Sequence, residues 1–435
     1  MTSSSIDPSR PPRRPPDGSG SWFWVGLILV GWVMPVLAAE VSAAGGFVQC
    51  RDATLVLDGR PLRIVSVNKY DLFAQFVMQD ARPLPPDSRQ KAVEALDELA
   101  AHGFTLIRVN GSPYWPGWWR RAWFDADPVE QARKQEVFLS RFDDMVDACR
   151  RRGIRLVVSL CWYVGNLADL GHHDLHEGIT NPGSAARRCV EQYIRRIVQR
   201  YRDDPTIALW EIGNEWNLTA DLQAPEGVLR HVPESLAPTP VVRDRRNNYT
   251  SDELAECVRQ IALLIKSIDG NHLVTTGHSA PRPAAMHLLR AARAGRDKDW
   301  TPDSEAELEE YLRLSHPDPV DVISIHFYDE AMSALGKPPC DVSNVAVYQR
   351  LAERIGKPLF IGEIGLCETV GRDYASPEAV NLVRRQCAAL RSAGVPIALY
   401  WTFRDESGRI DPTAGEYQLR FDRTGEVLRL LYESD

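Results

Sequence analysis

Short apolar runs rich in β-branched residues recur at wide intervals along most of the chain. Eight stand out, at residues 62–68, 104–110, 154–160, 207–213, 272–277, 322–328, 358–364 and 396–403. Between most of them lie stretches with apolar residues at every third or fourth position, for example 88–102, 135–152, 185–201, 251–268 and 376–393. The first pattern is typical of buried strands and the second of amphipathic helices. The chain is therefore predicted to alternate strand and helix.

Eight strands that alternate with helices predict an α/β fold with parallel pairing, a (β/α)8 or TIM barrel. The alternative is an open doubly wound sheet, which would need a glycine-rich phosphate-binding turn after an early strand, and the sequence has none there. Asp58-Gly59 lies between apolar runs ahead of the first strand and predicts a β-hairpin. We expect this hairpin to plug the bottom of the barrel. Two long connections, 216–250 and 279–321, are expected to shape a cleft at the top.

The N-terminus is predicted to be a targeting segment that does not belong to the barrel. Residues 1–20 are rich in Pro, Ser, Gly and Arg, a composition typical of disorder. The run 22–37 is apolar and uncharged, and about 16 residues suit a signal peptide better than a full membrane span. Residues 21–44 are thus read as a signal peptide, with cleavage after Ala39 or Ala44, or alternatively as a membrane tether. Residues 46–435 form the folded domain, secreted or periplasmic, or else anchored to the membrane.

Composition and charge narrow the function further. The 435 residues carry 51 Lys and Arg against 59 Asp and Glu, a net charge of −8, which argues against a nucleic-acid partner. Twelve Trp favour a ligand with flat, partly apolar faces, such as a sugar. The eight Cys are even in number and compatible with disulfides after export. Their connectivity stays open, and Cys161 and Cys367 could equally be free buried thiols.

Two carboxylates end predicted strands, where catalysis occurs in such barrels. Glu215 follows the fourth strand and Glu363 ends the seventh. Because side chains alternate along a strand, we expect Leu359, Ile361 and Glu363 to face the lumen and Phe360 and Gly362 the helices. The same alternation turns further polar and aromatic side chains into the lumen: Arg108, Asn110, Glu211, His326, Tyr328 and Trp401.

Such a set suits glycoside hydrolysis with two carboxyl groups. We expect Arg108 and Tyr328 to hold Glu363 as the anion, whose charge in turn keeps Glu215 protonated. Glu215 then donates a proton, Glu363 attacks the anomeric carbon, and their oxygens should lie about 5–5.5 Å apart. Glu211 is read as a buried structural acid, paired with Arg108 or with a neighbouring lumen group. Trp401 is expected to form the floor under the sugar, and Asn214 to bind its 2-hydroxyl if the strand end turns.

These residues resemble a known family in their strand order. Asn214-Glu215, His326-Phe327-Tyr328, Gly362-Glu363-Ile364-Gly365 and Trp401, with Arg108 on the second strand, are similar to glycoside hydrolases of clan A, family 5, which includes cellulases and endo-β-mannanases. The opening segment resembles that of mannanases, in which a hairpin leads to an Asn on the first strand, here Asn68. The resemblance spans residues 46–405.

The resemblance implies a retaining enzyme that cleaves β-1,4-mannan or β-1,4-glucan without a metal or cofactor. It assigns Glu215 as acid/base, Glu363 as nucleophile, and the rest to substrate binding: Asn68, Arg108, Asn214, His326, Tyr328 and Trp401. Two departures concern specificity. Members often carry a His at the end of the third strand, where this chain has Leu160-Cys161-Trp162-Tyr163, and Trp216 replaces a frequent Pro after Asn-Glu.

Two other functions remain compatible with the sequence. One is a carbohydrate-binding protein on the same barrel that does not turn over its ligand. The other is a metal-dependent hydrolase that uses His172, His173, Asp174 and His176. Trp115, Trp118, Trp119, Trp162 and Tyr163 are candidate sugar platforms or packing residues. The sequence leaves open which β-glycan is cleaved and whether the action is endo or exo.

Overall fold

The computed structural model describes residues 46–77, 85–113, 127–170, 175–223, 230–231, 242–243, 245–406 and 417–433. The predicted disordered segment 1–20 and signal peptide or anchor 21–44, including the tether 22–37, lie outside these ranges. So do Trp115, Trp118, Trp119, His172, His173 and Asp174. Among the helices of the described ranges, none is long and apolar enough to cross a membrane.

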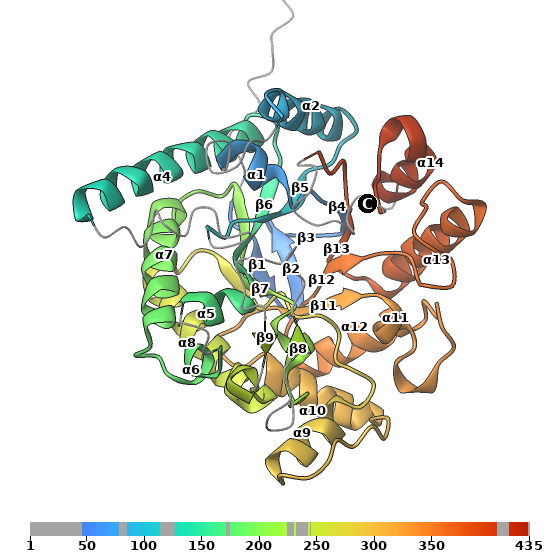
Figure 1. Ribbon diagram of the computed structural model, residues 1–435. Helices are drawn as coiled ribbons and strands as arrows, with labels where there is room; N and C mark the ends of the chain where they lie inside the picture. Colours follow the sequence, from blue (N-terminus) through green and yellow to red (C-terminus); the bar gives the residue numbers. More distant parts are fainter. Residues whose placement is uncertain are drawn as a thin grey trace, which may run out of the picture. The chain divides into compact units, whose positions relative to one another are not determined.

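The predicted barrel is confirmed (Figure 1). Eight strands pair in parallel in the order β10-β7-β6-β5-β4-β13-β12-β11. A parallel bridge from Thr275 to Val322 joins the two outer strands. The strands are β4 (Ile64–Asn68), β5 (Leu106–Asn110), β6 (Arg155–Tyr163), β7 (Ile207–Asn214), β10 (Leu273–Thr275), β11 (Ile323–Phe327), β12 (Leu359–Ile364) and β13 (Ile397–Tyr400).

Helices surround the strands and bury their apolar stripes against them (Figure 1). The longer ones are α2 (Ser88–Ala101), α4 (Pro128–Arg150), α7 (Ala185–Tyr201), α8 (Ser251–Ile268), α9 (Ala285–Arg293), α10 (Glu305–Ser315), α12 (Asn344–Ile355), α13 (Pro377–Ala393) and α14 (Phe421–Tyr432). Local sequence sets where several begin. Asp127, Ser184 and Ser376 cap α4, α7 and α13, and Thr250 forms a capping box with Glu253 on α8, which satisfies backbone N–H groups that a helix leaves unpaired.

The predicted hairpin closes the lower end of the barrel. It comprises β1 (Gln49–Arg51), β2 (Thr54–Leu57) and β3 (Arg60–Pro61), with the Asp58-Gly59 turn between the last two. Val48 and Leu55 pack in one buried cluster with lumen residues from the barrel strands, among them Leu106, Leu209 and Phe360. Apolar burial at this end leaves the carboxyl ends of the strands as the polar, open end.

One disulfide joins two loops at that open end. Cys340, in the connection after β11, is bonded to Cys367, just after β12, with the Cα atoms 5.7 Å apart. Cys367 is therefore not the free thiol that the sequence left possible, whereas Cys161 is free and buried. Strand and helix periodicity could not have paired them, because the two positions are 27 residues apart in sequence.

Candidate active site

A cleft of about 430 Å³ opens at the carboxyl ends of the strands. Glu215 and Glu363 both line it, together with Asn214, Tyr328, Trp162 and Trp401. One carboxylate oxygen of Glu215 and one of Glu363 lie within 4.8 Å of each other and of a ring nitrogen of His326. The two acids predicted from strand ends thus meet in one place.

Glu215 reaches the cleft because the chain turns sharply after β7. Its backbone is left-handed, with φ 55° and ψ 32°, a conformation that costs a non-glycine residue about 1–2 kcal/mol. Its N–H donates to the carbonyl of Gly277 (2.8 Å). The next residue, Trp216, is buried and donates its indole N–H to the carbonyl of Cys161 (3.0 Å). This turn lets both Asn214 and Glu215 face the cleft, the condition that strict alternation had excluded.

Glu363 reaches the lumen through a β-bulge. In the pairing of β12 with β11, Ile361 lies opposite Ile325 and Glu363 lies opposite His326. Gly362 between them therefore has no paired residue on β11. The predicted alternation below this point was wrong: Phe360 packs in the lumen, whereas Leu359 and Ile361 belong to the core shared with the helices. Because a bulge shifts the alternation by one residue, Glu363 still points inward.

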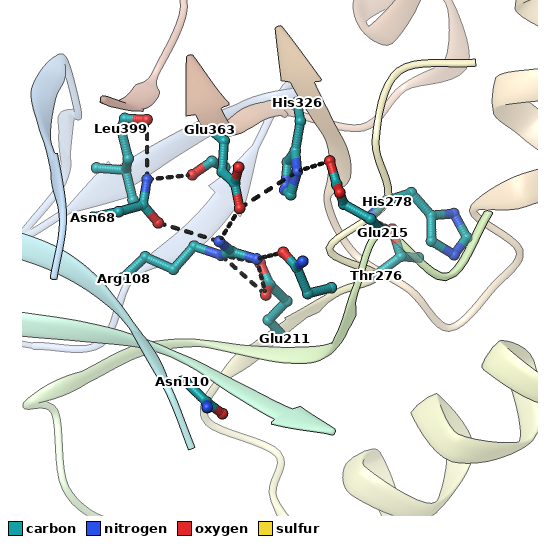
Figure 2. Close-up of polar contacts among 12 residues, drawn as sticks. Asn68, Arg108, Asn110, Glu211, Glu215, Thr276, His278, His326, Glu363 and Leu399 are labelled. Carbon is teal, nitrogen blue, oxygen red and sulfur yellow. Dashed lines mark hydrogen bonds and ion pairs between the residues drawn. The ribbon is translucent and has the colours of Figure 1, made fainter. Parts of the chain in front are cut away.

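The two carboxylates have different surroundings (Figure 2). Glu363 is 6% exposed; it accepts a hydrogen bond from Nη1 of Arg108 (2.8 Å) and one from the Tyr328 hydroxyl (3.0 Å). The Glu215 side chain is 27% exposed and lies 2.9 Å from Nδ1 of His326. Burial raises the pKa of Glu363 and the nearby Glu215 adds to the rise, while the Arg108 cation and the Tyr328 hydroxyl favour the Glu363 anion and oppose it. Arg108 therefore pairs directly with Glu363 but not with Glu215, as expected.

His326 and Tyr328 stay uncharged at neutral pH. Burial lowers the pKa of His326 to about 4, and burial followed by the nearby Glu363 raises the pKa of Tyr328 well above its usual value. His326 lies between the two acids, with Nδ1 3.6 Å from Glu363. The tautomer of the neutral imidazole sets whether Nδ1 donates a hydrogen bond to Glu215 or accepts one from it.

Aromatic rings form one wall of the cleft. Trp401 stacks on Tyr70 with ring centroids 4.8 Å apart, and Trp162 lies 6.3 Å from Trp401. The backbone of Trp401 is fixed on both sides, since its N–H donates to Ile364 (3.0 Å) and its carbonyl accepts from Tyr374 (2.7 Å). Such a rigid apolar face suits a sugar ring.

Several residues predicted to bind substrate lie one layer below the cleft. Asn68 and Arg108 are fully buried, and His326 is 1% exposed. Asn68 donates to the carbonyls of Gly362 (3.0 Å) and Leu399 (3.2 Å), so it braces β12 and β13 beside the bulge. Asn110 lies apart from the acids (Figure 2) and accepts from the N–H of Ser112 (2.8 Å). These positions are buried because the polar network that orients the acids occupies the lumen itself.

Trp162 and three acidic residues also line the cleft, and the sequence pattern did not single them out as cleft residues. Trp162 lines the cleft at the end of β6, the strand end where family members often have His. Asp329, Glu330 and Glu368 also line it. Their signal was position, since Asp329 and Glu330 come directly after Tyr328 at a strand end. They were missed because nothing in the local pattern separates cleft acids from solvated ones.

Three clusters of the described residues have donor sets that a metal could use, and none fits well. In the first, Asp329 lies beside Cys340 and Cys367, whose sulfurs are already bonded to each other. The donors of Glu215, His326 and Glu363 converge, but the Arg108 guanidinium lies 2.8 Å from Glu363 and opposes the entry of a second cation there. His287, Asp303 and Glu307 also converge, yet Asp303 accepts from the N–H of Met286 (2.8 Å) and Glu307 is paired with Arg290. His176 of the predicted metal run pairs with Glu253 (3.0 Å).

Buried histidines make the free energy of unfolding depend on pH. Burial lowers the pKa of His316 and His326 to about 4 and that of His278 well below its usual value. An unfolded His takes up a proton near pH 6.5. Between about pH 6.5 and 4 the unfolded state therefore binds more protons, and the free energy of unfolding falls as pH falls, by about 3 kcal/mol each for His316 and His326.

Urea titrations between pH 7 and 4 would measure this loss. We expect His316→Gln, which keeps a polar side chain near Leu312 and Ser324, to flatten the pH dependence by about one group's share. Gln199→Ala, at an exposed position without a titrating side chain, serves as the control and should leave the slope unchanged. An H316Q slope equal to that of the wild type would contradict the prediction.

The chain is similar in sequence and fold to several known proteins. The family model described as Cellulase (glycosyl hydrolase family 5) matches residues 81–406. Similar relatives include a probable mannan endo-1,4-beta-mannosidase C of Aspergillus terreus, 31% identical over 32% of this chain and 32% of that protein. Another is mannan endo-1,4-beta-mannosidase 2 of Oryza sativa subsp. japonica, 25% identical over 67% of this chain.

The chain spans less than two thirds of the length of these two relatives, since the second alignment covers 60% of the rice protein. A similar solved structure is the endo-1,4-beta-mannanase of Rhizomucor miehei, with a TM-score of 0.53 and 18% identity, over 88% of this chain and 99% of that one. At this identity the structural likeness establishes the barrel fold.

Proposed function

The chain belongs to glycosyl hydrolase family 5, whose model covers most of it, and from this membership we propose that it hydrolyses β-1,4-linked polysaccharide with retention of configuration. The observation that carries the proposal is the meeting of Glu215 and Glu363 in one cleft, with carboxylate oxygens within 4.8 Å of each other. Retaining enzymes hold their two carboxyl groups about 5–5.5 Å apart, whereas inverting enzymes need about 6.5–9.5 Å to admit a water molecule.

In the first step Glu363 attacks the anomeric carbon and Glu215 donates its proton to the leaving oxygen. The bond from the carbon to the leaving oxygen breaks as the bond to Glu363 forms. Arg108 and Tyr328, which both contact Glu363, hold its carboxylate as the anion and fix its orientation. The result is a glycosyl-enzyme ester and a free leaving-group alcohol.

In the second step water replaces Glu363. Esterification removes the negative charge of Glu363, so Glu215 gives up its proton more readily and accepts one from the attacking water. Nδ1 of His326 lies 2.9 Å from Glu215 and orients its carboxyl group. The hemiacetal product leaves with the same anomeric configuration as the substrate.

The cleft residues suit a chain of uncharged sugars. Trp401 and Trp162 offer apolar faces for sugar rings, and the amide of Asn214 lies at the cleft beside Glu215, where it can bind the 2-hydroxyl. Such a contact strengthens at the transition state. Because the relatives above are named mannan endo-1,4-beta-mannosidases, we place β-1,4-mannan first among the substrates and β-1,4-glucan second.

The test is product analysis with purified protein. We expect new reducing ends from mannan or glucomannan, fewer from cellulose derivatives, and little from β-1,3-glucan. Proton NMR during the first minutes should show the β-anomer before mutarotation, as retention requires. Initial release of the α-anomer would overturn the retaining mechanism. Binding to mannan without any product would favour a carbohydrate-binding protein instead.

We further propose that residues 21–44 export the protein, where polymeric substrate is accessible. The Cys340–Cys367 disulfide supports this, since disulfides persist outside the reducing cytosol. Fractionation of expressing cells with N-terminal sequencing would locate the protein and the cleavage site. A cytosolic protein that keeps residues 1–44 would contradict export.

A further inference from the structure

The guanidinium of Arg108 uses all of its hydrogen-bond donors inside the barrel (Figure 2). Nη1 donates to Glu363 (2.8 Å) and Asn68 (3.1 Å). Nε donates to both oxygens of Glu211 (3.0 and 2.9 Å), and Nη2 donates to Glu211 (2.8 Å) and Asn214 (2.5 Å). A guanidinium has five N–H donors, so none is left for substrate.

Glu211 holds the opposite edge of this guanidinium from Glu363. It lies on β7, is fully buried, and does not line the cleft. The backbone behind it is close-packed: a Cβ on Gly277 would lie 2.6 Å from Cδ of Glu211 and 1.9 Å from the carbonyl oxygen of Gly213. Glu211 therefore touches no substrate, and its place beside Arg108 is sterically defined.

We propose that Glu211 is a positioning residue for the nucleophile: it takes up part of the positive charge of Arg108 and thereby sets how strongly that charge acts on Glu363. The inference rests on the proposed function and adds a residue to it. The geometry carries it, because one cation is shared by two carboxylates through separate edges of the guanidinium.

The shared charge has a chemical purpose. An undivided arginine next to a carboxylate lowers the pKa of that carboxyl strongly, and a more weakly basic carboxylate is a weaker nucleophile. With Glu211 present, the pair Arg108–Glu211 is close to neutral as a unit, and Arg108 still orients Glu363. This agrees with the direction of the Glu363 shift, in which burial outweighs the opposing groups and raises the pKa.

Five other titratable groups face Glu363, and E211Q and E211D leave all of them unchanged. They are Arg108 on β5, Glu215 in the turn after β7, His326 on β11, Tyr328 directly after β11, and Tyr374. Tyr328 and Tyr374 stay uncharged because burial raises their pKa values, and His326 stays neutral above about pH 4.

The test compares the pH dependence of kcat/KM in the wild type, E211Q and E211D on a soluble glycan. Gln keeps the shape and an acceptor for Arg108 but removes the charge. In E211Q the acidic limb, which reports ionisation of Glu363, should move to lower pH by about one unit. E211D keeps the charge, and its limb should stay within about 0.3 units of the wild type.

Asp269→Asn is the matched control. Asp269 is also buried and ion-paired, with His272, but it has no described contact with Arg108 or Glu363. D269N should lower the melting temperature without moving the limb. An acidic limb in E211Q that coincides with that of the wild type, with activity reduced only through stability, would show a merely structural role and overturn the inference.

A double variant guards against failure of E211Q to fold, because it removes the buried cation together with the fully buried Glu211 carboxylate. Glu363 then keeps the hydrogen bond from the Tyr328 hydroxyl (3.0 Å). In R108Q/E211Q both opposing charges disappear, so we expect the acidic limb of its residual activity within about half a unit of the wild type. If Arg108 alone determined the pH of the acidic limb, its loss would move the limb to higher pH by more than about one unit. That result would overturn the inference.

The outcomes also separate this inference from the proposed function. If the wild type is active and the acidic limb of kcat/KM lies at the same pH in E211Q, only the inference is overturned. A wild type inactive on every glycan tested overturns the proposed function, and the role of Glu211 in catalysis falls with it.

Discussion

Replacement of Glu363 by alanine is expected to lower kcat on mannan by about 10⁴-fold or more, the range observed when a covalent nucleophile is removed. The fold should survive. Arg108, the partner that Glu363 leaves behind, remains paired with Glu211 through Nε and Nη2, so no uncompensated charge is buried. Circular dichroism and the melting temperature would verify that the variant is folded before its kinetics are read.

A small external nucleophile should restore part of the activity of Glu363→Ala. Azide can enter the space left by the side chain and attack the anomeric carbon from the same face when the leaving group is an activated phenol. The product would be an α-configured glycosyl azide, because a single displacement inverts the configuration. Glu378→Ala, at an exposed position on the first turn of α13, is the matched control and should keep wild-type kinetics. Wild-type turnover in E363A would remove the nucleophile assignment.

Loss of Glu215 should affect substrates unequally. For mannan, whose leaving alcohol needs a proton, we expect Glu215→Ala to lower kcat/KM by about 10²–10⁴-fold, the usual contribution of general acid catalysis. For an aryl glycoside with an acidic phenol the first step needs little protonation and should remain fast. The glycosyl-enzyme would then accumulate, because no base activates water, and a burst of phenol should precede slow turnover.

Two further readouts identify Glu215 as the acid/base. Azide should accelerate the slow step of Glu215→Ala and yield the β-configured glycosyl azide, since this displacement follows formation of the intermediate. The basic limb of the kcat/KM profile should also flatten, because the group that titrates there is gone. Glu215→Gln keeps a hydrogen-bonding group next to His326 but has no carboxyl proton to donate, so it should behave as the alanine variant does. Equal losses on mannan and on the activated aryl glycoside would contradict the role.

The amino-acid pattern alone was sufficient for the architecture. Eight β-branched runs, the helices between them and the Asp58-Gly59 turn are all present in the structure. These features are encoded within a few residues, by the alternation of a strand, the 3.6-residue period of a helix and the special backbone of a turn. The strand-end positions of Glu215 and Glu363 followed from the same local information, because every parallel strand of a barrel ends at the same face.

The orientation of the site residues depended on contacts between distant segments. Strict alternation gave the wrong faces for Leu359, Phe360 and Ile361, because the bulge at Gly362 arises from pairing with β11, which no pattern within β12 reveals. The sequence could not predict that Asn68 and Arg108 are buried below the cleft. A polar side chain that faces the lumen can either bind substrate or hydrogen-bond neighbouring side chains, and only the distances in the structure distinguish the two roles.

The sequence by itself therefore determined the barrel, its plugged end and the two acids at its open end, since periodicity and strand direction are local properties of the chain. Only the tertiary structure decided which nitrogens of Arg108 contact Glu211 and which contact Glu363, that Cys340 is bonded to Cys367, and that Trp162 joins Trp401 at the cleft. Each of these contacts joins segments far apart in sequence, and depends on how the strands are staggered and the loops packed.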